Sequence, residues 1–326
     1  MIRAGALLKQ GAPETNASIL KDDRRTSPYA DGAIQEEVRG MSGCRVRVMR
    51  GSMALVAAFA FAATVAGNAL ARGGGATVER PDLVRFFDAA GTQGAIVLHR
   101  LNGGGSTVAN RARAATAYTP ASTFKILNSL IAIEAGLVAD IDAATFRYSG
   151  TPFMVDGKPF GFPECNADVS LRTAFRLSCI AVYQGLARRI GLDRYREIIN
   201  RIGYGNGVLD QAPPDAFWLE GGYKVTAFQQ IEFLQRLVRA ELPFAKATID
   251  KTKSIMVMDD KEGRVMRGKT GYLYSTQPVI GWFVGWVEQA GDVTIFALNL
   301  DITKPEHAAA RISIVDQILH EIDDGR

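Results

Sequence analysis

A serine and a lysine stand three residues apart in Ser122-Thr-Phe-Lys125, where a helix is predicted to begin. Pro120 suits a first helical turn, and apolar residues between 124 and 133 cover most of the circumference, so a buried helix is predicted over residues 119–136. Side chains at i and i+3 share a helix face, so the hydroxyl and the amine are expected to meet. Because burial favours the neutral amine, the pair would place a base beside a nucleophile.

The Ser-x-x-Lys pattern is common by chance, and Ser18-Ile-Leu-Lys21 repeats it where no helix start is predicted. A second motif, Lys269-Thr-Gly271, precedes two strand-like runs at 279–287 and 293–300. Lys and Thr on a strand edge, followed by a Gly that permits close approach of another backbone, suit the docking of an extended acyl substrate. The two motifs together therefore indicate acyl transfer.

With further motifs between these two, the chain strongly resembles the class D serine β-lactamases, the oxacillinase group, from about residue 80 onwards. The matching residues are Ser122-Thr-Phe-Lys125, Ser178-Cys-Ile180, Tyr204-Gly-Asn206, Phe217-Trp-Leu-Glu-Gly221, Lys269-Thr-Gly271, residues 280–288 and Arg311. One departure is Ile180, where the family usually has Val. Its extra methylene is expected to alter water access to the lysine and hence the deacylation rate.

The resemblance implies roles for particular residues. Lys125, carboxylated by carbon dioxide, would be the general base, and Ser122 would be the nucleophile. The Trp218 indole N–H would donate to the carboxylated lysine. Ser178 and Lys269 would relay a proton to the departing lactam nitrogen.

The resemblance also implies a binding set. The backbone N–H groups of Ser122 and Tyr272 would form the oxyanion hole, while Lys269, Thr270 and Arg311 would hold the substrate carboxylate beside Gly271. Residues expected to support the pocket are Phe124, Ile180, Tyr204, Asn206 and Leu219, with Tyr223 and Tyr274 expected to line the cleft.

Other functions fit the chain less well. The three histidines, His99, His307 and His320, lack metal-ligand spacing, with His99 expected near a strand end and the others on a helix surface. No Gly-x-Ser-x-Gly elbow of a Ser-His-Asp hydrolase occurs. The alternative kept open is a β-lactam sensor or penicillin-binding protein that is acylated without turnover. No metal and no cofactor beyond carbon dioxide is expected, the partner is a β-lactam, and monomer and homodimer both stay open.

The N-terminal region predicts export. An apolar run at 53–66 follows Arg45, Arg47 and Arg50 and precedes Ala69-Leu-Ala71, as in a secretory signal peptide. We therefore expect a signal peptide over 41–71, cleaved after about Ala71, and a periplasmic enzyme with no stable membrane association. Residues 1–40 are expected to be an artefactual or disordered extension, with translation starting at Met41 or Met49.

The distribution of charged residues and the positions of the cysteines are compatible with an exported protein. Residues 1–71 hold nine of the 38 Lys and Arg and six of the 34 Asp and Glu, so the remainder is nearly neutral and gives no reason to expect nucleic acid. Cys44 would leave with the leader. Cys165 and Cys179 could form a disulfide or remain free thiols.

The order of predicted elements indicates an α/β fold of the α+β type. Strands are expected at 94–100, 106–110 and 264–300, helices between 120 and 244, and a last helix near 305–322. This order predicts an antiparallel sheet flanked by helices with an inserted all-helical lobe, similar to penicillin-binding transpeptidases. The β-lactamase domain, 72–326, would comprise a sheet lobe (about 76–119 and 250–326) and a helical lobe (about 120–249), with the active site at their junction.

Overall fold

The computed structural model describes residues 76–103, 105–155, 157–261 and 263–324. The predicted N-terminal extension and signal peptide lie outside these residues. Within the described part, none of the helices combines the length and the apolar character needed to span a membrane.

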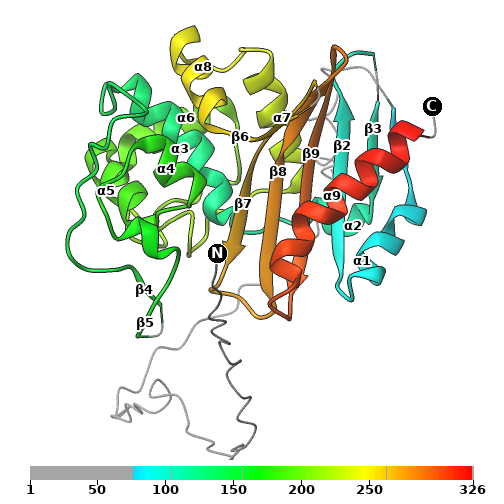
Figure 1. Ribbon diagram of the computed structural model, residues 1–326, viewed down its shortest axis with the longest axis horizontal. Coiled ribbons are helices and arrows are strands. Elements are labelled where there is room, and N and C mark those ends of the chain that lie inside the picture. Colours follow the sequence, from blue (N-terminus) through cyan, green and yellow to red (C-terminus); the bar gives the residue numbers. More distant parts are fainter. Residues whose placement is uncertain (1–75, 104, 156, 262, 325–326) are drawn as a thin grey trace, which may run out of the picture. The chain divides into compact units, whose positions relative to one another are not determined.

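Seven strands form the main sheet, in the order β1-β3-β2-β9-β8-β7-β6 (Figure 1). All neighbouring strands are antiparallel except β1 and β3, which are parallel. The strands are β1 (Thr77–Glu79), β2 (Gly94–Arg100), β3 (Ser106–Ala109), β6 (Val257–Lys261), β7 (Arg264–Leu273), β8 (Val279–Gln289) and β9 (Asp292–Ile302). The predicted antiparallel sheet with flanking helices is therefore confirmed.

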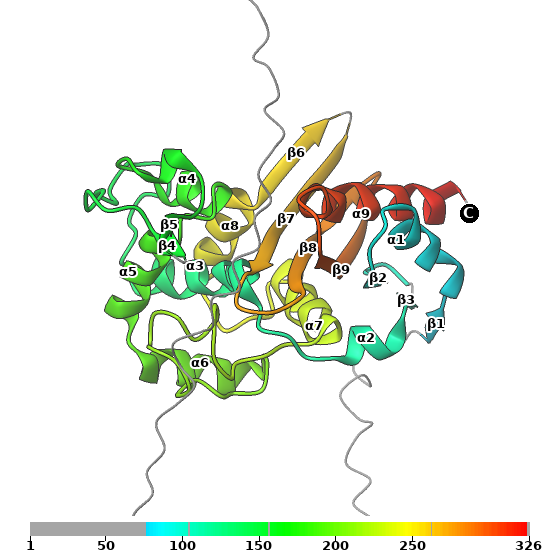
Figure 2. The same cartoon turned by 90° about the horizontal axis from the view of Figure 1, so that it is seen from below.

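Both faces of the sheet are buried. Alternate residues of β9 enter two different cores, with Ile295 and Ala297 in one and Phe296 and Leu298 in the other. Helices α1 (Arg85–Ala89) and α9 (His307–Asp324) cover one face, and α7 (Ala227–Val238) covers the other (Figure 2). A strand buried on both faces carries apolar residues at successive positions, which explains the nearly continuous apolar runs that predicted these strands.

Apart from α2 (Arg111–Ala115), which lies with β2 and β3, the remaining helices lie on the side of the sheet formed by β6 and β7 (Figure 1). They are α3 (Lys125–Glu134), α4 (Leu171–Arg176), α5 (Ile180–Ile190), α6 (Leu192–Ile202) and α8 (Lys246–Ile255). The boundary predicted between the helical lobe and the sheet lobe, at 249/250, falls inside α8. This helix packs against α3 and α4. Strand β6 escaped prediction because its sequence, Val-Met-Asp-Asp-Lys, is short and charged.

The helix predicted over 119–136 is present in two parts. A 3₁₀ turn, η2 (Ala121–Phe124), leads directly into α3, and the chain leaves the helix with Gly136 at φ +68°. Glycine reaches this left-handed conformation without steric cost, which accounts for the end of the helix there.

A long connection between α3 and α4 runs along the pocket described below. We call residues 145–155 and 157–169 the strap. It contains β4 (Met154–Val155), β5 (Lys158–Pro159) and the 3₁₀ turn η3 (Pro163–Cys165). The backbone pairing of Phe146 with Val169 closes its base. Cys165 forms a disulfide with Cys179, so of the two states that the sequence left open the structure has the bridge.

Candidate active site

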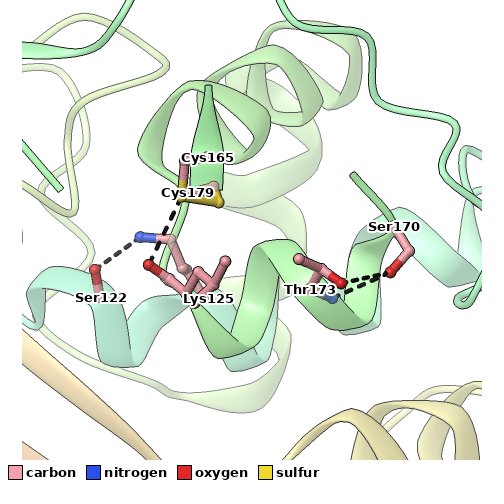
Figure 3. Close-up of a disulfide and its surroundings, with 7 residues drawn as sticks. Ser122, Lys125, Cys165, Ser170, Thr173 and Cys179 are labelled. Atoms are coloured by element: carbon pink, nitrogen blue, oxygen red, sulfur yellow. Dashed lines mark hydrogen bonds between the residues drawn. A yellow bond between two sulfur atoms is a disulfide. The ribbon is translucent and has the colours of Figure 1, made fainter. Parts of the chain in front are cut away.

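Ser122 and Lys125 meet as the i, i+3 spacing predicts. Lys125 Nζ donates a hydrogen bond of 2.7 Å to Ser122 Oγ (Figure 3). Ser122 is only 9% exposed and Lys125 is fully buried. Burial, and secondarily the positive charge of Lys269, holds the pKa of Lys125 well below its usual value. The amine is therefore disposed to be neutral beside the hydroxyl, which is the state a general base requires.

Aromatic rings enclose this pair. Phe124, between Ser122 and Lys125 in the chain, stacks on Trp218 with ring centroids 5.8 Å apart and contacts Phe217 and Tyr195 edge-on or tilted. The Trp218 indole Nε1–H is buried and finds no hydrogen-bond partner among the described residues. An unpaired buried donor is costly, so this N–H is available to an acceptor such as a water molecule or a bound group.

Ser178 lies in the short connection between α4 and α5. Its φ is +61°, and its N–H donates to Phe175 O, while the N–H of Cys179 donates to Ala174 O. The Ser178 hydroxyl is buried and, within the described chain, has no hydrogen-bond partner. It can therefore accept or donate a proton without first breaking another bond. Ile180 begins α5 directly after this connection and is buried.

Lys269, Thr270 and Gly271 occupy the part of β7 that extends past its pairing with β6. The last β6 partner along this direction is Arg267, and the Gly268 N–H still donates to Met256 O. Beyond Gly268 the outer side of β7 faces η2. A Cβ on Gly271 would lie 3.1 Å from Pro120 O and 3.2 Å from Thr123 Cγ2. A side chain at this position would therefore crowd η2, and the glycine lets β7 lie close to it.

Lys269 is the second buried lysine of the site. Its Nζ donates to Thr270 O at 3.0 Å and lies 5.7 Å from the centre of the Phe175 ring, one turn before Ser178. Burial, aided by the charge of Arg311, lowers the pKa of Lys269 to about 7. A group with this pKa can both give and take a proton near neutral pH.

Arg311 reaches the pocket from α9. It is 9% exposed, and its guanidinium donates to Gly271 O and Ala308 O, so it is not a solvated surface residue. Burial lowers its pKa to about 10. A Cβ on Gly281 would come within 2.8 Å of Arg311 Cδ, so the glycine of β8 leaves the space through which the arginine passes. Gly281 is a site residue that only the tertiary contact reveals.

These groups share one pocket, with a volume of about 750 Å³. Ser122, Ser178, Ile180, Leu219 and the β7 and α9 residues Thr270, Gly271, Tyr272 and Arg311 line it. Four predicted site residues are buried behind this lining and can influence the pocket only through neighbouring side chains. They are Phe124, Lys125, Trp218 and Lys269.

Tyr204 and Asn206 lie outside the lining and support it. The Tyr204 hydroxyl donates to Gln230 Oε1 at 2.8 Å, and Asn206 Nδ2 donates to Gly222 O at 2.7 Å. The expectation that Tyr223 lines the cleft is wrong, because its ring is fully buried and its hydroxyl donates to Tyr204 O. Tyr274 does line the pocket.

A large part of the pocket wall comes from the strap, which sequence reasoning missed. Its lining residues include Phe153, Phe160 and Cys165. Phe160 contacts the rings of Tyr272 and Tyr274, with centroids 6.1 and 5.3 Å apart. The alternation of aromatics with Gly and Pro over 146–163 was the available signal, but it matched no regular element.

The histidines take no part in the pocket lining. His99, near the end of β2 as predicted, bonds Ser106 Oγ and Gln235 Nε2. His320 is exposed, but the surface position predicted for His307 is wrong, because it is buried at the start of α9. Throughout the described ranges, no three His, Cys, Asp or Glu side chains gather as metal ligands would.

The lowered pKa of Lys269 predicts a pH-dependent stability. The unfolded state keeps the proton up to about pH 10.4 while the folded state releases it near 7. Stability is therefore gained as pH rises across this window and lost as pH falls across it, with no further change below about pH 7. Relative to Lys269→Met, the unfolding free energy of the wild type should rise with pH by at most about 1.4 kcal/mol per unit. Urea unfolding of both proteins between pH 6 and 10 measures this, and a constant difference would contradict the assignment.

The sequence is similar to a protein-family model and to several known enzymes. The model of the penicillin-binding protein transpeptidase domain matches residues 87–322. The β-lactamase OXA-5 of Pseudomonas aeruginosa is 36% identical over 236 residues, which cover 72% of this chain and 85% of that protein. The β-lactamase OXA-48 of Klebsiella pneumoniae is 35% identical over 230 residues, which cover 71% and 83%.

Solved structures with a similar fold are also class D β-lactamases. The class D β-lactamase YbXI from Nostoc superposes with a TM-score of 0.70 at 41% sequence identity, covering 75% of this chain and 99% of that one. FUS-1, a class D β-lactamase from Fusobacterium nucleatum, gives a TM-score of 0.69 at 33% identity and covers 75% and 98%.

Proposed function

Because this chain belongs to the class D β-lactamases and is thus a serine hydrolase of β-lactam antibiotics that supports resistance, we propose how its own residues perform the reaction. The observation that carries the proposal is the 2.7 Å contact between a fully buried lysine amine and the Ser122 hydroxyl beside the pocket.

In acylation, Ser122 Oγ attacks the lactam carbonyl and its proton passes to the Lys125 side chain. The N–H groups of Ser122 and Tyr272 stabilise the developing oxyanion, a contribution that typically amounts to about 10²–10³ in rate for each donor. Ser178 Oγ then delivers a proton to the lactam nitrogen, and Lys269, whose pKa of about 7 suits it to exchange protons, resupplies Ser178. The lactam C–N bond breaks, and the acyl group remains on Ser122.

The substrate carboxylate is held at the open edge of β7. Thr270 and Arg311 line the pocket there, and the Lys269 amine lies buried behind the lining. Since Arg311 donates to Gly271 O, it also fixes the backbone carbonyl beside the docked substrate. Binding of an anion here favours the charged forms of both basic groups, so substrate and lysine protonation are coupled.

Deacylation requires a base that can activate water. We propose that Lys125 Nζ is carboxylated by carbon dioxide, with loss of one proton, which supplies a carboxylate base at the site. The residues fit such a group: the amine is buried with a lowered pKa, and the unpaired Trp218 indole N–H can donate to a carboxylate oxygen. Ile180 lines the pocket, and its extra methylene relative to Val alters the access of water to the lysine.

Bicarbonate should raise activity. Only the neutral amine adds carbon dioxide, and protonation of Lys125 as pH falls through its lowered pKa reverses the modification. Initial rates of enzyme incubated at acidic pH without bicarbonate should therefore be low and should recover when bicarbonate is added. Matched ionic strength with chloride is the control. Rates that ignore bicarbonate at every pH, together with no ¹³C signal from labelled bicarbonate, would exclude carboxylation.

Turnover of a chromogenic cephalosporin by substoichiometric purified protein, with bicarbonate present, tests the function as a whole. Sustained multiple turnovers support the proposal. A single burst equal to the protein concentration, followed by no further reaction, would instead indicate a β-lactam sensor or penicillin-binding protein that retains its acyl group.

We also propose that the protein acts in the periplasm after removal of residues 41–71, with 72–326 forming the catalytic domain. The Cys165–Cys179 disulfide supports an oxidising compartment, because disulfides persist there and are rare in the cytosol. N-terminal sequencing of the exported protein tests the cleavage site.

A further inference from the structure

The Cys165–Cys179 disulfide joins the strap to the connection that carries Ser178. Cys165 is the last residue of η3 in the strap, and Cys179 is the residue between Ser178 and the first residue of α5. Both cysteines line the same pocket as Ser122. Figure 3 shows the disulfide close to Ser122 and Lys125. The cross-link is therefore part of the active-site wall.

Ser178 depends on its neighbours for its position. Its φ of +61° lies in the left-handed region, which residues other than glycine adopt at an energetic cost and keep only where surrounding contacts enforce it. Its hydroxyl has no hydrogen-bond partner in the described part of the chain, so no bond of its own directs it. The position of Ser178 Oγ is thus set by the backbone on either side.

That backbone is held differently on its two sides. Towards α4, the Ser178 and Cys179 N–H groups donate to Phe175 O and Ala174 O. Towards the strap, the constraint is the covalent bond of Cys179 to Cys165.

The strap supplies a fixed point for this bond. Its base is closed by the Phe146–Val169 pairing and by the ion pair of Arg147 with Asp168. The Phe160 ring rests against Tyr272 of β7 and against Tyr274, the first residue after β7. The strap therefore spans the pocket from β7 to the α4–α5 connection, and the disulfide is its attachment beside Ser178.

We propose that the Cys165–Cys179 disulfide is a positioning element that holds the Ser178 hydroxyl in place for proton delivery to the lactam nitrogen. Neither sulfur contacts the reacting atoms in this role. The disulfide acts through the backbone of Ser178, and its loss lets that residue leave its costly conformation. This inference rests on the proposed role of Ser178 in acylation.

A double-mutant cycle tests the coupling. The single-turnover acylation rate constant, followed by rapid quench and intact mass, should fall about ten-fold in Cys165→Ala, with substrate affinity changed less than about three-fold. In a Ser178→Ala background the same substitution should change the rate less than about two-fold, because the positioned group is already gone. A simple packing or folding role would give the same loss in both backgrounds.

Two controls keep the result interpretable. Ile318→Val, in the core on the opposite sheet face, should lower the melting temperature without changing the acylation rate. Reduction of the wild type by a phosphine, which yields two thiols and the phosphine oxide, should reproduce the ten-fold loss without any substitution. Reoxidation should restore the acylation rate. The reduction experiment needs no substitution, so it tests the proposal even if Cys165→Ala folds poorly.

An unchanged acylation rate in the reduced wild type, or equal losses with and without the Ser178 hydroxyl, would overturn the inference. The proposed function is judged separately, because the rate of acylation is measured whether or not turnover follows. If the wild type with its disulfide intact fails to release its acyl group, that result counts against the hydrolytic function. The acylation rates of the four proteins in the double-mutant cycle still show whether the disulfide acts through Ser178.

Discussion

Replacing Lys125 with alanine should lower the acylation rate by about 10²–10⁴, because the substitution removes the base that receives the Ser122 proton. The small amount of acyl-enzyme that forms should persist, since the same side chain is proposed to activate the hydrolytic water. Intact mass spectrometry after long incubation should therefore show a stable acyl adduct at a time when the wild type is free of it.

A second lysine, which is partly buried, controls for the loss of an amine whose pKa is lowered by burial. Lys253 on α8 also has a pKa lowered by burial, and its Nζ donates to Val238 O away from the pocket lining. Lys253→Ala should acylate and deacylate as the wild type does, whatever it does to stability. Full turnover by Lys125→Ala would show that another group is the base and would overturn the mechanism.

Replacing Ser122 with alanine should abolish the covalent intermediate and lower turnover by about 10⁶, the scale seen when a catalytic nucleophile is removed from a serine hydrolase. Binding should largely survive, because the groups proposed to hold the carboxylate, Thr270 and Arg311, are untouched. Calorimetric titration should thus give a substrate affinity close to that of the wild type, while mass spectrometry shows no adduct at any time.

A neighbouring hydroxyl separates this effect from a general disturbance of α3. Ser129 lies one turn after Lys125, where its hydroxyl donates to Lys125 O and contacts Tyr183 Oη at 2.9 Å. Ser129→Ala loses a buried hydroxyl from the same helix but should still acquire the acyl mass. Retention of an adduct by Ser122→Ala would mean that a different residue is the nucleophile.

Much of the fold could be predicted because its signals are local. The apolar runs of β8 and β9 and the strand at 94–100 appear in the structure within a residue or two of their predicted limits. The i, i+3 spacing that joins Ser122 to Lys125 is a property of a single helical turn, so the sequence alone could place hydroxyl and amine together.

The rest of the site depends on contacts between distant segments. Ser178, Lys269 and Arg311 come together at one pocket only because the α4–α5 connection, β7 and α9 converge there. Burial at this place lowers the pKa values of Lys269 and Arg311. The sequence left the pairing of Cys165 and Cys179 open, because a disulfide requires the two residues to be close in the folded protein, and the sequence does not give that distance. Helical spacing fixes neighbours within a turn, whereas burial, pKa and the attachment of the strap are decided by packing across the whole chain, which no local pattern encodes.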